Sequence, residues 1–481
     1  MTVRKALAYS YAEKYGSYVL GLLSTMVISR LLGPAEIGVF SVGMALVGIV
    51  AVIREFGLST YLVQEVELSD ERVRAAFTLA VALGVGLSLV VLVLSVPAGH
   101  FYGDPNVTSV IAILALNFAL TPFGSISQAL LVRELRFSTL TWIRLLVGLI
   151  QAVGSVVLAA LGLGPQSLAW AAVLASVANS VISIASRPHP MSLIFSGAQL
   201  RRVFVVGGPV TAISIIEDVV TSLPELVLGR TQSLTAAGLF SRARGMSQMA
   251  HQLLARAAGP VFLAVFADRN REGVPLAPLY LKATACVTTL GWAGLAMLAV
   301  LSDPVVRVLF GSNWLAVVPL MRWLCLAAAV ALLTSGAHHL LLAGGGMRDV
   351  LHAKLLALPA HAIGILVGAV YGARGMAIAM VVTSAFASLL LALAVRRRMG
   401  ISLRDQLSPV VASAVITVAG AAGSSVALLL AVPDSSVGAL AKLAVGVSAG
   451  TVLATAVLMT GKHPLRVEVE LLIARLRRAS P

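Results

Sequence analysis

Charged residues are scarce in this sequence, and their scarcity decides its class. Only 11% of the 481 residues are Asp, Glu, Lys or Arg, whereas 59% are hydrophobic, and soluble domains carry roughly 25% charged residues. This composition excludes a water-soluble enzyme. The mean hydropathy is +0.96, and an apolar run of about 20 residues can cross a bilayer as a helix. Most of the chain is therefore expected to be membrane-spanning helix.

Cysteine and the common cofactor-binding motifs are also lacking. The two cysteines, Cys286 and Cys325, lie in apolar runs, which excludes a disulfide framework and is typical of small buried side chains. No glycine-rich loop leads into the lysine that a phosphate-binding loop needs. His338 and His339 are adjacent, so they cannot both face one metal ion from a helix. We expect no cofactor and no metal site, and neither an ATP-driven transporter nor a zinc enzyme is supported.

What the sequence does contain is a long series of apolar runs separated by short polar links. These runs predict an all-α, polytopic membrane protein with about fourteen transmembrane helices. The expected spans are 14–32, 37–55, 75–97, 107–131, 141–161, 166–186, 203–229, 236–264, 278–301, 315–343, 354–371, 374–395, 410–432 and 437–460. After the last span, apolar residues at helical spacing alternate with arginines from Leu465 to Arg478, which predicts a basic amphipathic helix on the inner membrane surface.

The basic residues divide unevenly between the two sides of these spans. If the N-terminus is cytoplasmic, 26 of the 35 Lys and Arg residues fall in cytoplasmic segments, and four fall outside: Arg30, Arg230, Arg307 and Arg374. Because positive charge is retained on the cytoplasmic side, this split predicts an even number of spans with both termini cytoplasmic. It also accounts for the net charge of +15 without nucleic-acid binding, since no basic patch is interleaved with aromatic residues.

An internal repeat relates the two halves of the chain. Arg30 and Gly38-Val39-Phe40-Ser41 recur 200 residues later as Arg230 and Gly238-Leu239-Phe240-Ser241, and Tyr102-Gly103 matches Phe310-Gly311. We therefore expect two pseudo-symmetric six-helix lobes around a central cavity, because parallel repeats place a substrate site between two lobes. The predicted boundaries are 1–202 for the N-terminal lobe, 203–400 for the C-terminal lobe, and 401–481 for helices 13 and 14 with the cytoplasmic tail.

Acidic residues inside span seven are candidates for ion coupling, because an ionisable side chain in a membrane is costly. Glu217 and Asp218 lie about midway along the span, and Glu225 lies nearer its outer end. We expect these carboxylates to couple transport to an ion gradient. The structural alternative is a buried ion pair between Glu217 or Asp218 and an arginine of span eight.

Basic residues inside spans eight and ten are candidates for a cavity that binds an anionic substrate. They are Arg242, Arg244, His251, Arg256 and Arg322. Helical spacing places Arg242 and Arg256 on one face and Arg244 and His251 on the opposite face, so one of the two pairs is expected to line a central cavity. Arg242 and Arg244 are also near enough to the outer boundary to extend into water instead.

Several segments resemble one known family. They are Ser29-Arg30-Leu31-Leu32-Gly33-Pro34-Ala35-Glu36-Ile37-Gly38, Glu55-Phe56-Gly57-Leu58, Gln128-Ala129-Leu130-Leu131-Val132-Arg133-Glu134-Leu135-Arg136-Phe137, and Leu228-Gly229-Arg230 with Ala237-Gly238-Leu239-Phe240-Ser241. Over nearly the whole chain the sequence is similar to the Wzx-type polysaccharide repeat-unit flippases of the multidrug/oligosaccharidyl-lipid/polysaccharide exporter superfamily. That family often has an Asp-Asn pair where this sequence has Pro224 and Glu225, which favours Glu217 and Asp218 as the coupling acids.

The resemblance implies that the protein translocates an undecaprenyl-diphosphate-linked oligosaccharide repeat unit to the outer leaflet of the bacterial cytoplasmic membrane. It would do so by alternating access, for the synthesis of a surface polysaccharide such as O-antigen, capsule or exopolysaccharide. The implied partners are this substrate, membrane lipids, and a polysaccharide polymerase with its chain-length regulator. We expect a monomer, and the span-eight arginines suit a diphosphate because a guanidinium stays charged.

Three other functions remain as alternatives. A cation or drug antiporter of the same superfamily would use the span-seven acids, but the excess of arginine inside the spans favours an anionic substrate. A membrane polysaccharide polymerase or ligase usually has a long outer loop, which this sequence lacks. The last alternative is a structural membrane subunit without transport activity.

Overall fold

Local sequence fixes the ends of the helices in the computed structural model of this chain. Ser69 and Asp104 each precede a helix and accept a hydrogen bond from a backbone N–H of its first turn. Gly103 and Gly400 each follow a helix with positive φ values of 70° and 71°, a conformation that glycine adopts without steric cost. Caps and glycines therefore stand at the predicted links between apolar runs.

The structure describes most of the chain. The described residues are 3–55, 58, 62, 63, 65, 68–186, 215, 217–433, 435–461, 463–467 and 470. Within helices, the side chains of residues 3–12, 55, 251–261, 263 and 264 are outside this description. All structural statements below concern the described residues.

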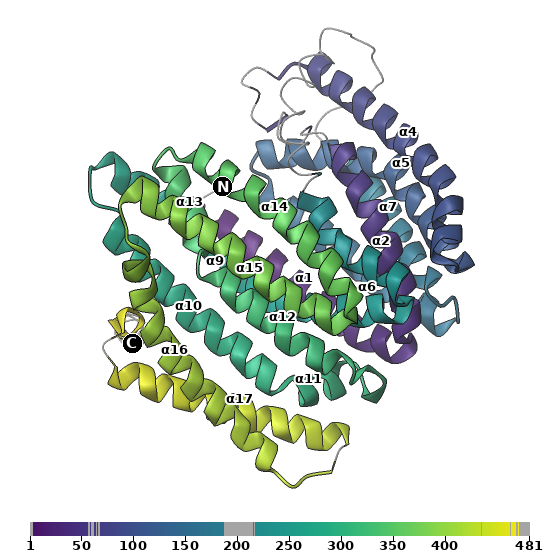
Figure 1. Cartoon of the computed structure of the whole chain (residues 1–481). Coiled ribbons are helices and arrows are strands. Elements are labelled where there is room, and N and C mark those ends of the chain that lie inside the picture. The colour runs from purple at the N-terminus through teal and green to yellow at the C-terminus, as the bar shows by residue number, and fades with distance from the viewer. Residues whose placement is uncertain are drawn as a thin grey trace, which may run out of the picture. The chain divides into compact units, whose positions relative to one another are not determined.

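The chain forms two compact units, of which the first is Met1–Gly238. Its helices are α1 (Val3–Leu31), α2 (Pro34–Glu55), α4 (Asp70–Tyr102), α5 (Pro105–Arg133), α6 (Phe137–Ala160) and α7 (Gln166–Ala185), followed by helical residues 217–231. Helix α5 packs against α2, α4 and α7, and α6 packs against α1 and α7 (Figure 1). The apolar core of this unit lies mainly around α5.

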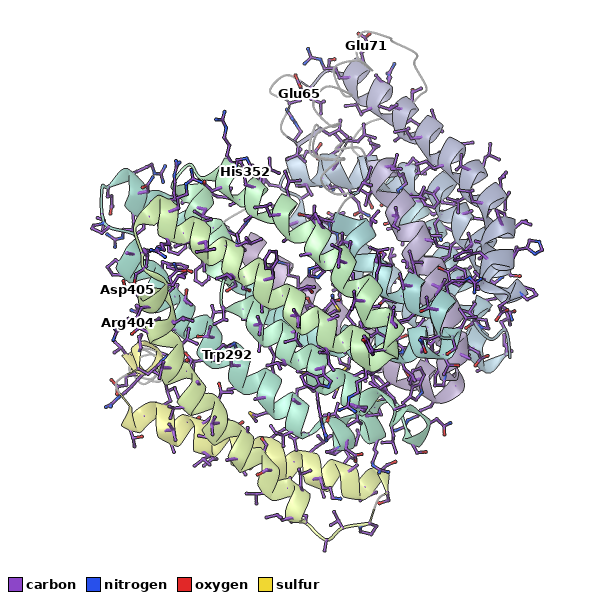
Figure 2. The ribbon with its side chains drawn as sticks, viewed as in Figure 1. Glu65, Glu71, Trp292, His352, Arg404 and Asp405 are labelled. Carbon is purple, nitrogen blue, oxygen red and sulfur yellow. The ribbon has the colours of Figure 1, made fainter. Side chains whose placement is uncertain are left out.

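The second unit is Leu239–Pro481. Its helices are α9 (Leu234–Arg271, which begins in the first unit), α10 (Ala277–Val300), α11 (Ser302–Leu309), η1 (Ser312–Trp314), α12 (Val317–Leu332), α13 (Ser335–Ala343), α14 (Met347–Val370), α15 (Gly372–Met399), α16 (Leu403–Ser425), η2 (Val426–Leu429) and α17 (Ser436–Thr460). Neighbouring pairs are α14 with α15, α10 with α16, and α16 with α17 (Figure 1). Trp292 of α10 donates its indole N–H to the carbonyl oxygen of Ala329 on α12 at 2.7 Å (Figure 2).

The observed helices confirm an all-α, multi-pass membrane fold over the described residues. Eleven of them are long and apolar enough to cross a membrane, counting Val317–Ala343 as one span. The expected spans 14–32 and 236–264 correspond to α1 and α9, and 203–229 lies partly outside the described residues. The total of fourteen and the lobe boundaries at 202 and 400 stay predictions, as does the tail helix, most of which is outside the description.

One link and one span differ from the expected pattern. Residues 302–314 lie between the expected spans 278–301 and 315–343, and they contain α11 and η1. An ion pair of 2.8 Å between Asp303 and Arg307 supports the short helix α11. The expected continuous span 315–343 is divided into α12 and α13 next to Thr334. Both cysteines are free, as expected; Cys325 is buried, whereas Cys286 is only half-buried.

The two copies of the internal repeat touch each other at their glycines. A Cβ on Gly38 would overlap the carbonyl oxygen of Leu234, and a Cβ on Gly238 would overlap that of Pro34. Pro34 and Leu234 are themselves 200 residues apart, so the contact is symmetric with respect to the repeat. Backbone lies directly on backbone here, which requires glycine at both positions.

Candidate functional site

The three acidic candidates occupy different environments in helical residues 217–231. Glu217 is exposed and Asp218 is half-buried, whereas Glu225 is 1% exposed. Asp218 and Glu225 are seven residues apart and so share a helix face, while Glu217 points about 100° away from Asp218. The most deeply buried carboxyl group is therefore Glu225 and not the pair that the sequence favoured.

The surroundings of Glu225 explain its burial. The next residue, Leu226, accepts a hydrogen bond of 3.2 Å on its carbonyl oxygen from the phenol of Tyr102 on α4. A Cβ on Gly229 would lie 2.7 Å from Val42 of α2. This turn of the helix is thus enclosed by α2 and α4, in the first unit.

Arg242 is the candidate that the structure places most distinctively. Its guanidinium carbon lies 5.7 Å from the ring centre of Trp314 and 6.0 Å from that of Phe310, within cation–π distance of both. The two aromatic side chains are fully buried. Among the described residues nothing accepts a hydrogen bond from the buried Nε of Arg242, and no carboxylate pairs with it.

The remaining basic candidates are only partly placed. Arg322 of α12 is exposed and donates from its Nε to the hydroxyl of Ser302 at 3.1 Å. Arg242 and Arg322 therefore both contact the segment 302–314, which contains α11 and η1. The structure brings these two arginines, from α9 and α12, to the same segment of the second unit. Arg244 is half-buried. His251 and Arg256 belong to α9, but their side chains lie outside the described residues.

Arg54 is a basic residue of the first unit that its position in the sequence does not mark as a site residue. Because it ends an apolar run, the positive-inside rule assigns it to a cytoplasmic segment. Its Nη1 donates to the hydroxyl of Thr121 at 3.1 Å, and its guanidinium carbon lies 5.4 Å from the ring centre of Phe118. Thr121 lies near the middle of α5, so the charge of Arg54 reaches well into the helix bundle of this unit.

Arg54 meets a row of neutral polar side chains between α5 and α7. Asn117, Thr121 and Gln128 follow helical spacing along one face of α5. Asn117 accepts a hydrogen bond from Ser176 of α7, and Gln128 donates to Asn179 of α7 at 2.6 Å. Polar side chains that hydrogen-bond to one another inside a membrane stabilise the contact between two helices, and they also indicate a candidate binding site.

These arrangements suit an anionic ligand more than a metal ion. Over the residues described, no three His, Cys, Asp or Glu side chains are grouped closely enough to hold a metal ion. Arg54 and Arg242 instead each present a guanidinium against an aromatic ring, one in each unit. Guanidinium groups bind phosphate oxygens through two parallel hydrogen bonds.

The chain is similar to known proteins in both sequence and fold. The family described as "Polysaccharide biosynthesis protein" matches residues 27–319, more than half of the chain. The lipopolysaccharide biosynthesis protein WzxC of Escherichia coli (strain K12) is 26% identical over 317 residues, 64% of this chain and 63% of WzxC. The succinoglycan biosynthesis transport protein ExoT of Rhizobium meliloti (strain 1021) is 26% identical over 330 residues, 68% of this chain and 67% of ExoT. The chain thus spans less than two thirds of WzxC.

The fold has a counterpart among solved structures. The lipid II flippase MurJ, in an inward closed conformation, matches with a TM-score of 0.71 and 14% identity, covering 94% of this chain and 99% of that chain. At this identity the match shows a shared fold. The family match begins two residues before the Ser29-Arg30 segment on which the sequence resemblance rests, and that resemblance is confirmed. The chain therefore belongs to the polysaccharide biosynthesis protein family.

Proposed function

We propose that this protein moves an undecaprenyl-diphosphate-linked oligosaccharide repeat unit from the cytoplasmic to the outer leaflet of the bacterial cytoplasmic membrane. Both termini are cytoplasmic in this proposal, and the exported unit is built into a surface polysaccharide. The names of the two relatives, one a lipopolysaccharide biosynthesis protein and one a succinoglycan transport protein, support this assignment. So does the shared fold with a protein named as a lipid II flippase.

Arg242 carries the proposal. A guanidinium held against two buried rings, with no described carboxylate beside it, is costly unless an anion offsets its charge. A diphosphate is such an anion, since it offers several oxygens to a planar group with five N–H donors. Arg242 therefore contacts the diphosphate of the carrier, and the rings of Phe310 and Trp314 hold the guanidinium in place while the site is empty.

The other basic candidates are proposed as further contacts for the substrate, each within its own unit. Arg54 in the first unit provides a second guanidinium, and the adjoining hydroxyl and amide groups of α5 and α7 suit the hydroxyls of a sugar. Arg244, His251, Arg256 and Arg322 are proposed to line the same transport path in the second unit. The lobes alternate between inward-open and outward-open states, with residues 1–202 as one lobe and 203–400 as the other.

Energy coupling is proposed to reside in Glu217, Asp218 and Glu225, with Glu225 the most buried of the three. A cation or drug antiporter is the second candidate function, because a carboxylate buried inside a helix bundle is what a cation-coupled carrier needs. The two functions differ in the charge of the cargo. The protein acts as a monomer and delivers its product to a polysaccharide polymerase with its chain-length regulator.

Substitution of Arg242 tests the proposed function. Arg242→Gln and Arg242→Lys are expressed in a strain that lacks the gene, and both exported polysaccharide and membrane-inserted protein are measured. We expect Arg242→Gln to abolish export and Arg242→Lys to reduce it by about tenfold, because lysine offers a point charge without the bidentate geometry. Arg269→Gln is the matched control, since this exposed arginine near the end of the same helix pairs with Glu272 at 2.9 Å.

Reconstituted vesicles then separate the two candidate functions. The purified protein should move undecaprenyl-diphosphate-linked sugar across the vesicle membrane, and Arg242→Gln should not. Export at the normal rate in Arg242→Gln, with equal amounts of protein, would refute the role of Arg242. Movement of a lipophilic cation without movement of the lipid-linked sugar would establish the antiporter instead.

A further inference from the structure

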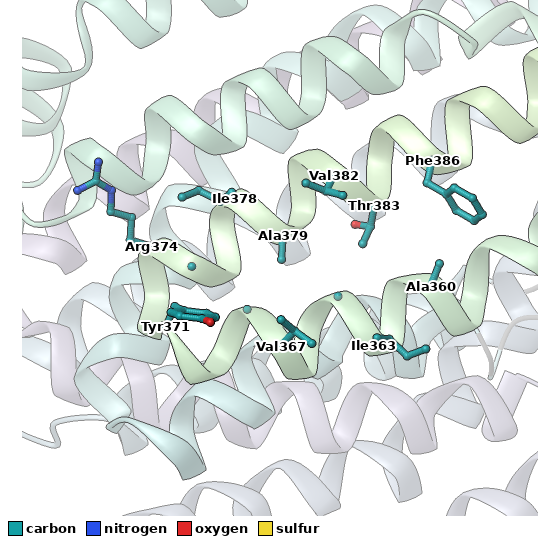
Figure 3. Close-up of a pocket in the computed structure, with 13 residues that line it drawn as sticks. Ala360, Ile363, Val367, Tyr371, Arg374, Ile378, Ala379, Val382, Thr383 and Phe386 are labelled. Atoms are coloured by element: carbon teal, nitrogen blue, oxygen red, sulfur yellow. The ribbon is translucent and has the colours of Figure 1, made fainter.

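The hairpin of α14 and α15 carries an apolar groove of about 800 Å³ on its surface (Figure 3). Gly364 and Gly368 form its floor, and a Cβ on Gly368 would lie 2.8 Å from the Cβ of Ala379, so the two helices are in close contact below the groove. Its walls include Ile363, Val367 and Val382, all of them exposed. The groove is therefore open to the hydrocarbon that surrounds the protein.

The length of the groove matches one leaflet of a bilayer. It runs along α14 from Ala360 to Tyr371, which is about 16 Å at 1.5 Å per residue. The hydrocarbon core of a bilayer is about 30 Å thick. A single acyl chain of a phospholipid spans one leaflet, or about half of this thickness. The dimensions favour a lipid chain as the occupant.

One end of the groove is polar. Tyr371 and Arg374 lie at the turn that joins α14 to α15, beyond the aliphatic walls (Figure 3). Both side chains are exposed, and no described acidic residue pairs with Arg374. In the predicted topology this turn is on the outer side of the membrane, at the depth where tyrosine and arginine meet lipid headgroups.

The same combination recurs in the first unit. An apolar groove of about 500 Å³ lies between α2 and α4 and ends at Phe101 and Tyr102. The guanidinium carbon of Arg230 lies 5.1 Å from the ring centre of Phe101. Arg230 and Arg374 are two of the four basic residues predicted on the outer side, and a third, Arg307, is paired with Asp303. Two of the four basic residues predicted on the outer side thus lie at the ends of apolar grooves.

We infer that the α14–α15 groove binds an acyl chain of an acidic phospholipid of the outer leaflet, with the lipid phosphate at Arg374. The aliphatic walls take the chain, and the guanidinium takes the phosphate, whose charge an acidic phospholipid leaves uncompensated, whereas a zwitterionic lipid offsets it with its own ammonium group. Such a lipid would cover the glycine contact between the two helices on its membrane side. The leaflet in this assignment depends on the predicted topology, but the binding itself does not.

Photolabelling of the full-length protein tests this inference. The purified protein is placed in lipid nanodiscs that contain phosphatidylglycerol with a photoactivatable acyl chain, and the labelled peptides are identified by mass spectrometry. We expect labelling to concentrate on α14 and α15. Val367→Trp should fill the groove and remove most of this labelling, while Leu366→Trp should not, because Leu366 is similarly exposed, at 58% against 54%, but does not line the groove.

Arg374→Gln tests the headgroup contact. Loss of one surface charge should lower the labelling by phosphatidylglycerol by about fivefold, and should lower labelling by phosphatidylcholine, whose phosphate charge is offset by its own ammonium group, by much less. Three results would overturn the inference: equal labelling of α14, α15 and the exposed faces of α16 and α17; displacement of the label by equimolar undecaprenyl phosphate, which would make the carrier lipid the occupant; or a dimer that Val367→Trp dissociates, which would make it a second copy of the chain.

Discussion

The contact between Gly38 and Gly238 allows a stability change to be worked out from the structure. In Gly38→Ala the new Cβ would lie 2.5 Å from the carbonyl carbon of Leu234, and ordinary contact begins near 3.4 Å. The carbonyl oxygen of Leu234 is nearer still, so the two backbones must separate by more than about 0.9 Å. Overpacking of this kind costs about 3 kcal/mol where neither side can rotate away, and replacing a helical glycine by alanine returns about 1 kcal/mol. The expected net loss is about 2 kcal/mol.

Two glycines of the same helices serve as matched controls. Gly48 in α2 and Gly245 in α9 have nothing within 4 Å of a built Cβ. Gly48→Ala and Gly245→Ala should therefore be neutral or stabilise the protein by up to about 1 kcal/mol. Gly238→Ala should behave like Gly38→Ala, since its Cβ would lie 2.8 Å from the backbone nitrogen of Gly38.

The assay is thermal unfolding of the purified protein in detergent, together with its amount in membranes. Gly38→Ala and Gly238→Ala should melt below the wild type, and the two controls at or above it. The double variant should lose less than the sum of the single losses, because one separation of the backbones makes room for both methyl groups. Equal melting temperatures for Gly38→Ala and Gly48→Ala would show that the backbones do not meet as described.

Three further predictions follow from the structure and the sequence. Glu225→Gln should lower export by about tenfold, or about 1.4 kcal/mol, and Glu217→Gln by much less, because only Glu225 is buried; equal effects at equal protein levels would contradict this. Reporter fusions after Pro433 should be on the outer side and those after Arg397 on the inner side, and an inner signal at Pro433 would disprove the topology. Burial lowers the pKa of His463, and the neutral ring accepts the N–H of Leu465 on Nδ1, so this contact should hold above about pH 6.5 and weaken as the pH falls below it. Hydrogen exchange of the Leu465 amide, corrected for the intrinsic pH dependence of exchange, should then be less protected at about pH 5 than at about pH 7 in the wild type, and its protection should not depend on pH in His463→Gln.

The fold class could be predicted from the sequence because it depends on composition and on the positions of breaks in apolar runs. The repeat was visible because both copies carry a glycine, Gly38 and Gly238, where the structure leaves no room for a Cβ. The α11 helix could not be predicted from hydropathy. It is stabilised by the pair Asp303 and Arg307, four residues apart, a pattern that is also common in exposed loops.

The candidate site was only partly predictable from the sequence. A charged residue inside an apolar run is easily identified, whereas the side chains that surround it in the fold are not. Arg242 was found because it interrupts a span, but its contact with Phe310 and Trp314 joins residues about 70 positions apart. Glu225 was ranked below Glu217 and Asp218 from the middle of the span, yet depth along a helix says nothing about which face is enclosed. The residues that contact this turn of the helix at Leu226 and Gly229, Tyr102 and Val42, come from other helices.

Arg54 shows how a residue can be counted correctly for topology and still be misplaced in space. The positive-inside rule depends on a sum over many residues, so moving Arg54 from the cytoplasmic group leaves 25 of the 35 basic residues inside and four outside, and the predicted orientation is unchanged. The side chain of Arg54 nevertheless reaches Thr121, near the middle of α5. An arginine at a span boundary can therefore extend towards the membrane surface or into the bundle. A hydroxyl and an aromatic ring at the right depth favour the second direction, and in this chain Thr121 and Phe118 provide both.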